Sequence, residues 1–77
     1  MSQCSIDHSH EDVRKKFESQ LEYLPGGIRE LFTAFFDKEH TQDILNDVFH
    51  LLKKYDLSDE DEKQKRNRRL ELILKNI

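Results

Sequence analysis

The chain has few of the residues that interrupt or crosslink a backbone. Its 77 residues include one cysteine, one proline, two glycines and no tryptophan. The single thiol, Cys4, excludes a disulfide within one chain; together with the lack of a recognisable secretion signal it fits a reducing cytosol, so we expect a cytoplasmic protein. The proline and both glycines stand together at residues 25–27, which leaves long uninterrupted segments on either side.

The sequence also lacks a long apolar run and an excess of positive charge. No stretch approaches the ~18 consecutive apolar residues of a membrane helix, so we expect a soluble protein with no membrane partner. The net charge is −3, with acids and bases in both halves, unlike the basic body of a duplex-binding protein. Charged residues make up 38% of the chain, yet the apolar residues recur with a regular period, which argues against a disordered chain.

That period is the period of a helix. Apolar side chains recur three or four residues apart in segments that begin at cap residues: Ser9, Thr41 and Ser58 can each accept a backbone amide of a first helical turn. We predict an all-α protein in which residues 1–8 are a flexible N-terminal tail and residues 9–77 form one domain. The domain is a small bundle of four helices with short loops, over residues 9–24, 27–38, 41–56 and 58–76.

The aromatic residues predict where the core lies. Phe32, Phe35 and Phe36 share a face of the second predicted helix. An exposed aromatic groove for a partner is the alternative interpretation of this cluster. A chain this small needs its large apolar side chains inside, so we predict that the cluster belongs to the core.

We find no pattern typical of catalysis or of a metal site. Cys4, His8 and His10 are metal-ligand residue types, but their spacing is not that of a zinc site. Residues 25–27 lack the Lys-Ser/Thr pair of a phosphate-binding loop and follow a helix, not a strand. No acid stands inside an apolar stripe, where burial would tune it for acid–base chemistry. We expect a non-enzymatic protein without cofactor, metal ion or small-molecule substrate.

The last predicted helix is the most informative segment. Residues 59–69 contain no apolar side chain; four acids come first, and five bases follow from Lys63 to Arg69. A helix that is polar all round must be held by its own ion pairs or by a partner. Three acid–base pairs stand four residues apart in the order that stabilises a helix: Asp59–Lys63, Asp61–Lys65 and Glu62–Arg66.

An apolar end follows this polar stretch and predicts self-association. Because the polar stretch offers nothing to bury, we predict that the end extends past its own core and packs on a second copy, giving a homodimer. The predicted interface is Leu70, Leu72, Ile73, Leu74 and Ile77. A charged face of the same helix would select the partner electrostatically, through Glu62, Lys65, Arg66 and Arg69. The first hypothesis is therefore a protein-interaction or regulatory module that binds a protein partner or itself.

A nucleic-acid-binding accessory protein is the alternative hypothesis. The basic stretch from Lys63 to Arg69 could contact phosphates. A helix would spread these five bases around most of its circumference, and three of them would face an acid one turn earlier. Arg68 and Arg69 alone lack such an acid. We therefore place this hypothesis second.

Overall fold

The computed structural model describes residues 8–76, and within them the chain forms four α-helices and two 3-10 turns, with no strand. The predicted all-α fold class is confirmed. The elements in chain order are α1 (His10–Gln20), η2 (Leu21–Tyr23), α2 (Gly26–Phe36), α3 (Gln42–Leu52), η3 (Tyr55–Leu57) and α4 (Glu60–Lys75). Within these residues every helix is too short or too polar to cross a membrane.

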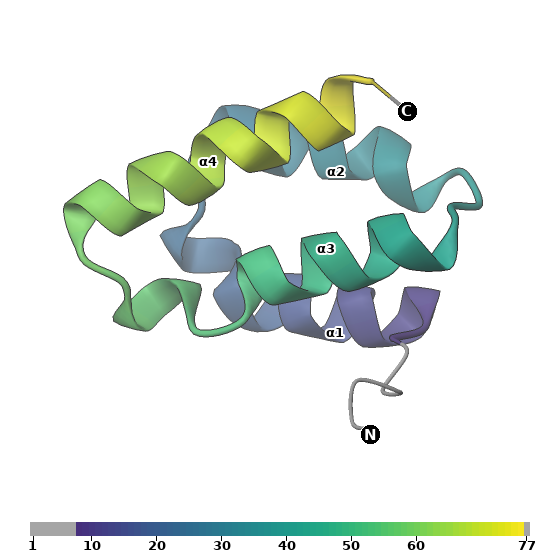
Figure 1. Cartoon of the computed structure of the whole chain (residues 1–77), viewed down its shortest axis with the longest axis horizontal. Helices are drawn as coiled ribbons and strands as arrows, with labels where there is room; N and C mark the ends of the chain where they lie inside the picture. Colours follow the sequence, from purple (N-terminus) through teal and green to yellow (C-terminus); the bar gives the residue numbers. More distant parts are fainter. Residues whose placement is uncertain (1–7, 77) are drawn as a thin grey trace.

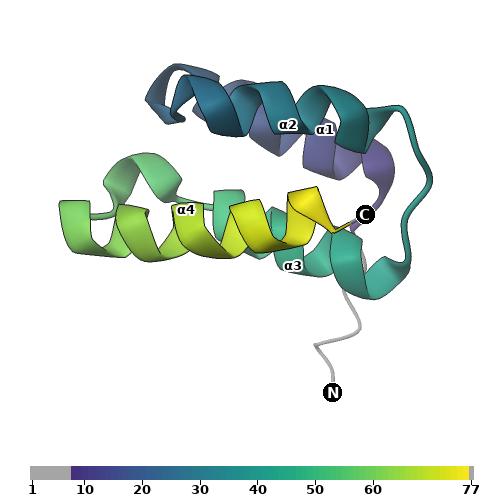
Figure 2. The same ribbon diagram turned by 90° about the horizontal axis from the view of Figure 1, so that it is seen from above.

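Consecutive helices run in opposite directions, so α1 and α3 run one way and α2 and α4 the other (Figure 1). The closest packing joins helices two apart in the chain, α1 with α3 and α2 with α4, and α3 also packs on α4. Figure 2 shows two layers, α1 with α2 and α3 with α4. The last helix therefore rests on two others over its length.

The first helix begins as the sequence predicts. The Ser9 hydroxyl accepts the Asp12 amide at 3.0 Å, and the Asp12 carboxylate accepts the Ser9 amide at 3.3 Å. This reciprocal pair satisfies two amides that have no partner inside the helix. Thr41 likewise caps α3, accepting the Ile44 amide at 3.3 Å.

The cap of α4 differs from the prediction by one residue. Asp59, not Ser58, is the cap: its carboxylate accepts the Glu62 amide at 2.8 Å. Ser58 instead donates its hydroxyl to the Lys54 carbonyl at 3.2 Å. A carboxylate is favoured over a hydroxyl here because the helix dipole is positive at this end.

Two predicted helices end earlier than expected and continue as 3-10 turns. α1 gives way to η2, and Leu24 is extended because Pro25 disfavours a helical conformation at the residue before it. α3 ends at Leu52, two residues before Lys54, which has a left-handed backbone with φ of 59°. A hydrogen bond joins the end of α1 to η3, since Gln20 Oε1 accepts the Asp56 amide at 2.8 Å.

The core draws on all four helices. Phe32 and Phe35 have no exposed surface, and Phe36 packs against them at the edge, so the predicted aromatic core is confirmed. The buried apolar residues are Val13, Leu24, Ile28, Phe32, Phe35, Leu45, Val48, Leu52, Tyr55, Leu70 and Leu74.

His8, which belongs to the predicted tail, packs against α3. The His8 ring stacks on Phe49 with centroids 3.5 Å apart, and its amide donates to Asn46 Oδ1 at 3.0 Å. Gln42 Nε2 donates to the His8 carbonyl at 2.7 Å. The prediction of a flexible tail is therefore corrected at His8. The rest of that tail, Cys4 included, and Ile77 lie outside the described residues, and the extent of the domain stays a prediction.

Candidate functional site

The apolar end of α4 is part of the core of its own chain. Leu70 has no exposed surface, Leu74 is 4% exposed, and Ile73 packs against the same cluster. The prediction that these three residues pack on a second copy is therefore corrected, because the core of their own chain buries Leu70 and Leu74 and contacts Ile73. Leu72 is the exception, with 59% of its surface exposed. Ile77 lies outside the described residues.

The face of α4 directly opposite Leu70 and Leu74 is fully exposed. Four residues spaced four, three and four apart follow its outermost line, as expected for a helix of 3.6 residues per turn. We call them the outer stripe: Asp61, Lys65, Arg68 and Leu72, all exposed. The stripe presents an acid, two bases and a leucine on a rigid, packed helix.

Arg66 is not part of a free charged face, as predicted, but is bound into the fold. Its Nη1 donates to the carbonyls of Leu51 at 3.2 Å and Lys53 at 2.7 Å, and its Nε donates to Glu62 Oε2 at 3.0 Å. The guanidinium thus satisfies carbonyls at the end of α3, where the dipole favours a cation. Arg66 and Glu62 hold α4 against α3, and of the predicted charged face only Lys65 and Arg69 remain exposed.

A buried polar contact also anchors the polar half of α4. The Tyr55 hydroxyl donates to Asn67 Oδ1 at 2.6 Å, and Lys63 Nζ lies 5.7 Å from the Tyr55 ring centroid. Burial raises the pKa of the Tyr55 hydroxyl, and the charge of Glu60 adds to the rise, while the charge of Arg66 opposes it. This contact explains how a helix stretch without apolar residues stays attached to its own core.

The predicted ion pairs form in one case of three. Glu62–Arg66 is present, whereas Asp59 serves as the cap and Lys63 lies over Tyr55. The one other ion pair within residues 8–76 is Glu71–Lys75, at 3.9 Å. In the described part of the chain, Lys65, Arg68 and Arg69 therefore have no carboxylate partner.

The histidines pack on aromatic rings and do not assemble a metal site. His10 lies 6.0 Å from Phe35 and 5.6 Å from His40, centroid to centroid, with the three rings nearly parallel. His40 Nε2 lies 2.6 Å from the Phe35 carbonyl and, since a carbonyl only accepts, carries the proton. His10 Nε2 is buried without a hydrogen-bond partner among the described residues. Residues 8–76 bring no three potential metal ligands together.

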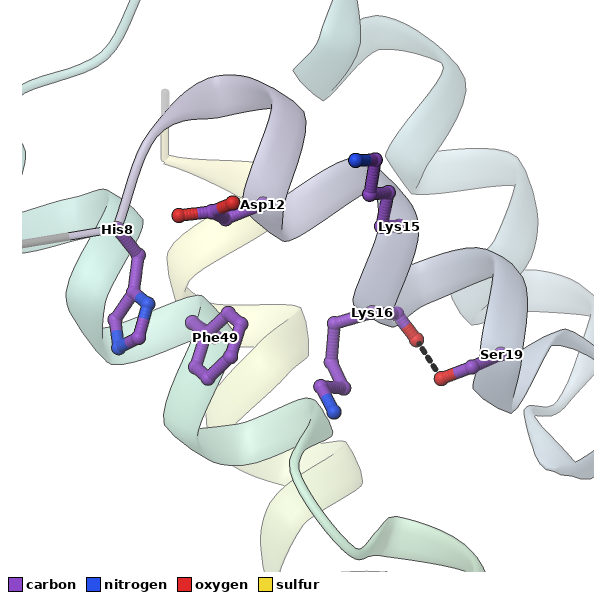
Figure 3. A pocket seen from close by; sticks show the side chains of 6 residues that line it. All are labelled: His8, Asp12, Lys15, Lys16, Ser19 and Phe49. Atoms are coloured by element: carbon purple, nitrogen blue, oxygen red, sulfur yellow. Dashed lines mark hydrogen bonds between the residues drawn. The ribbon is translucent and has the colours of Figure 1, made fainter.

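An open groove lies between α1 and α3 (Figure 3). Its volume is about 450 Å³, and its lining is His8, Asp12, Lys15, Lys16, Ser19 and Phe49. The aromatic ring of the groove, Phe49, is already in contact with other side chains of the chain. His8 stacks on this ring, and Lys16 Nζ lies 5.4 Å from its centroid. The groove therefore offers no free aromatic platform for a ligand.

Comparison of the chain with protein-family models, with curated proteins and with solved structures found no match. Function is therefore inferred from the surface of α4. The sequence interpretation missed Asp61 and Arg68 as surface residues of one stripe. The signal was present, because both lie about half a turn of helix away from the Leu70 and Leu74 side. It was missed because the buried face of α4 continues through polar residues, Lys63, Arg66 and Asn67.

Proposed function

We propose that this chain is a small non-enzymatic protein-interaction module of the cytoplasm, which contacts its partner through the outer stripe of α4. The observation that carries the proposal is Leu72. It is a large apolar side chain, 59% exposed, on a helix whose opposite face is held by its own core. An exposed leucine on a rigid helix is a ready contact for a partner, because its burial removes apolar surface from water without ordering the backbone.

The charges around Leu72 indicate which kind of partner fits. Lys65 and Arg68 lie in the stripe and Arg69 lies beside it, without ion-pair partners in the described residues. Bases that have no carboxylate of their own favour a partner with acidic groups around an apolar contact. This surface replaces the interface predicted from sequence, since Leu70 and Leu74 are buried within the chain.

The proposal includes no catalytic step. Tyr55 has a raised pKa, but its hydroxyl is held by Asn67 inside the fold. The carboxylates that could act in pairs lie on the surface of α4, where water solvates them. A regulatory role would follow if the partner occupies the outer stripe, or if two partners compete for it.

The test is affinity capture from a lysate of the cells that make the protein. Arg68→Glu and Leu72→Asp are each compared with the unaltered chain, and we expect both to lose the same captured proteins. The matched controls are Arg29→Glu and Tyr23→Asp, because both residues are exposed and lie outside α4. Capture that is equal for all five chains would contradict the proposal, provided that circular dichroism shows each variant folded.

Nucleic acid is the second candidate partner. It is favoured by three exposed bases that have no carboxylate partner within residues 8–76: Lys65, Arg68 and Arg69. Asp61, Glu60 and Glu71 are exposed on the same helix and would repel phosphates. The same capture separates the two candidates if the lysate is first treated with nuclease. Proteins that stay bound after this treatment but are lost with Arg68→Glu support a protein partner. Loss on nuclease treatment alone supports nucleic acid.

A further inference from the structure

The charges of the outer stripe are divided along the helix. The first turn of α4 is acidic, with Glu60, Asp61 and Glu62, and the exposed residues that follow are basic, with Lys65 and Arg68 in the stripe. A surface with opposite charges at its two ends can complement itself when a second copy is turned around. This division of charge therefore indicates a partner surface with the same charges in the reverse order, as a second copy provides.

We propose that the outer stripe binds the outer stripe of a second copy, with the two α4 helices antiparallel. This inference rests on the proposed function and names the partner of that surface. A two-fold axis passes midway between Gln64 and Lys65. Asp61 of one copy and the partner's Arg68 then lie the same distance from the axis, about 5 Å along the helix. Each acid faces a base, twice per dimer.

Two other arrangements of the same two helices are disfavoured by charge. A parallel pair would place Arg68 beside the partner's Arg68 and Asp61 beside the partner's Asp61, and like charges repel. An antiparallel pair centred between Lys65 and Arg68 would place bases against bases and Leu72 against the partner's Asp61. The alignment centred between Gln64 and Lys65 avoids these conflicts at Asp61, Arg68 and Leu72. It leaves one like-charge contact, Lys65 beside the partner's Lys65 at the axis, where both long side chains are exposed and can turn toward solvent.

The same alignment gives Leu72 a contact. Leu72 then lies near the start of the partner's α4, close to the partner's η3. The partner's Leu57 in that turn is 76% exposed. The interface is one helix wide and holds little apolar surface, so the association is weak and transient rather than obligate. Its strength falls with added salt, because the charges at its rim are exposed to solvent.

Sedimentation velocity of the purified protein, up to about 1 mM, tests the pairing. We expect a monomer–dimer equilibrium that weakens with salt. Asp61→Arg and Arg68→Glu should each weaken dimerisation by about tenfold, because each places like charges together twice per dimer. The double variant Asp61→Arg with Arg68→Glu exchanges the charges and should restore it. Arg29→Glu is the matched control and should leave the dimer unchanged.

Crosslinking tests the register independently of affinity. In a Cys4→Ser background, Lys65→Cys places two thiols beside the proposed axis, within the reach of a disulfide under oxidation. Leu72→Cys places them about 22 Å apart along the helices, so it should not crosslink. A parallel pair would crosslink at both positions, and that result would overturn the proposal.

The failures of the two proposals are distinguishable. A monomer at every concentration and salt, or a charge exchange that does not restore the dimer, overturns the self-pairing. If such a monomer still loses lysate proteins with Arg68→Glu, the outer stripe binds a different protein and the proposed function stands. If neither association nor capture responds to Arg68→Glu, both proposals are wrong.

Discussion

Single residues decide whether α4 is a free helix or a packed one. The Arg66 guanidinium donates to two carbonyls at the end of α3 and to the Glu62 carboxylate. The Tyr55 hydroxyl donates to Asn67 Oδ1. Both contacts turn polar side chains inward, where a periodicity argument expects apolar ones. The sequence could not reveal this, because Arg66 and Asn67 read as solvated residues until their partners on other elements are known.

The buried Tyr55 hydroxyl makes stability depend on pH in the alkaline range. Its pKa is raised mainly by burial, so the folded protein holds this proton more tightly than the unfolded chain. The contribution is fully present below the unfolded value of about 10 and is lost as pH rises through the higher folded pKa. We expect the free energy of unfolding, from urea titrations, to fall over that range.

Tyr55→Phe is the control for this pH dependence. It should cost about 1 kcal/mol at neutral pH, through the lost hydrogen bond to Asn67, and should flatten the alkaline fall. All other titratable groups are the same in both chains, so the comparison isolates the contribution of Tyr55. An alkaline fall of the same size in Tyr55→Phe would show that Tyr55 is not its source.

At the scale of elements, the few helix-breaking residues of the chain predict where the helices lie. They predict the residues at which the helices end less well. The caps at Ser9 and Thr41 are local signals, and both are confirmed. Pro25 is a third local signal and directly precedes α2, but the predicted turn at residues 25–27 is wrong for both glycines, which lie in the first turn of that helix. The end of α3 has no such signal, because no glycine or proline stands there. Its left-handed residue is Lys54, which suits this conformation poorly and gives no sequence warning.

Lys54→Gly should therefore stabilise the protein. Glycine adopts a positive φ without the steric cost of a side chain, which outweighs its greater freedom in the unfolded chain. We expect a gain of about 0.5–1 kcal/mol in the free energy of unfolding, measured by urea denaturation. Lys53→Gly, one residue earlier at a φ of −63°, is the matched control and should give no gain. A loss with Lys54→Gly would contradict this view of the α3–η3 junction.

At the scale of the whole molecule, the fold class and the aromatic core follow from helical periodicity, and the structure confirms both. The arrangement of the helices does not follow from it. Periodicity gives each helix an apolar face but does not say which helix covers it, so Leu70 and Leu74 were assigned to a second copy. They are buried in the core of their own chain, whereas Leu72 is exposed.

A pair of substitutions two residues apart tests this account most directly: Leu70→Asp and Leu72→Asp, compared by thermal unfolding followed by circular dichroism. Leu70 has no exposed surface, so a carboxylate there should cost about 3–5 kcal/mol or more, enough to unfold a domain of this size. Leu72→Asp should change stability by less than about 0.5 kcal/mol and remove only the binding of the outer stripe. A folded Leu70→Asp, or an unfolded Leu72→Asp, would contradict the account.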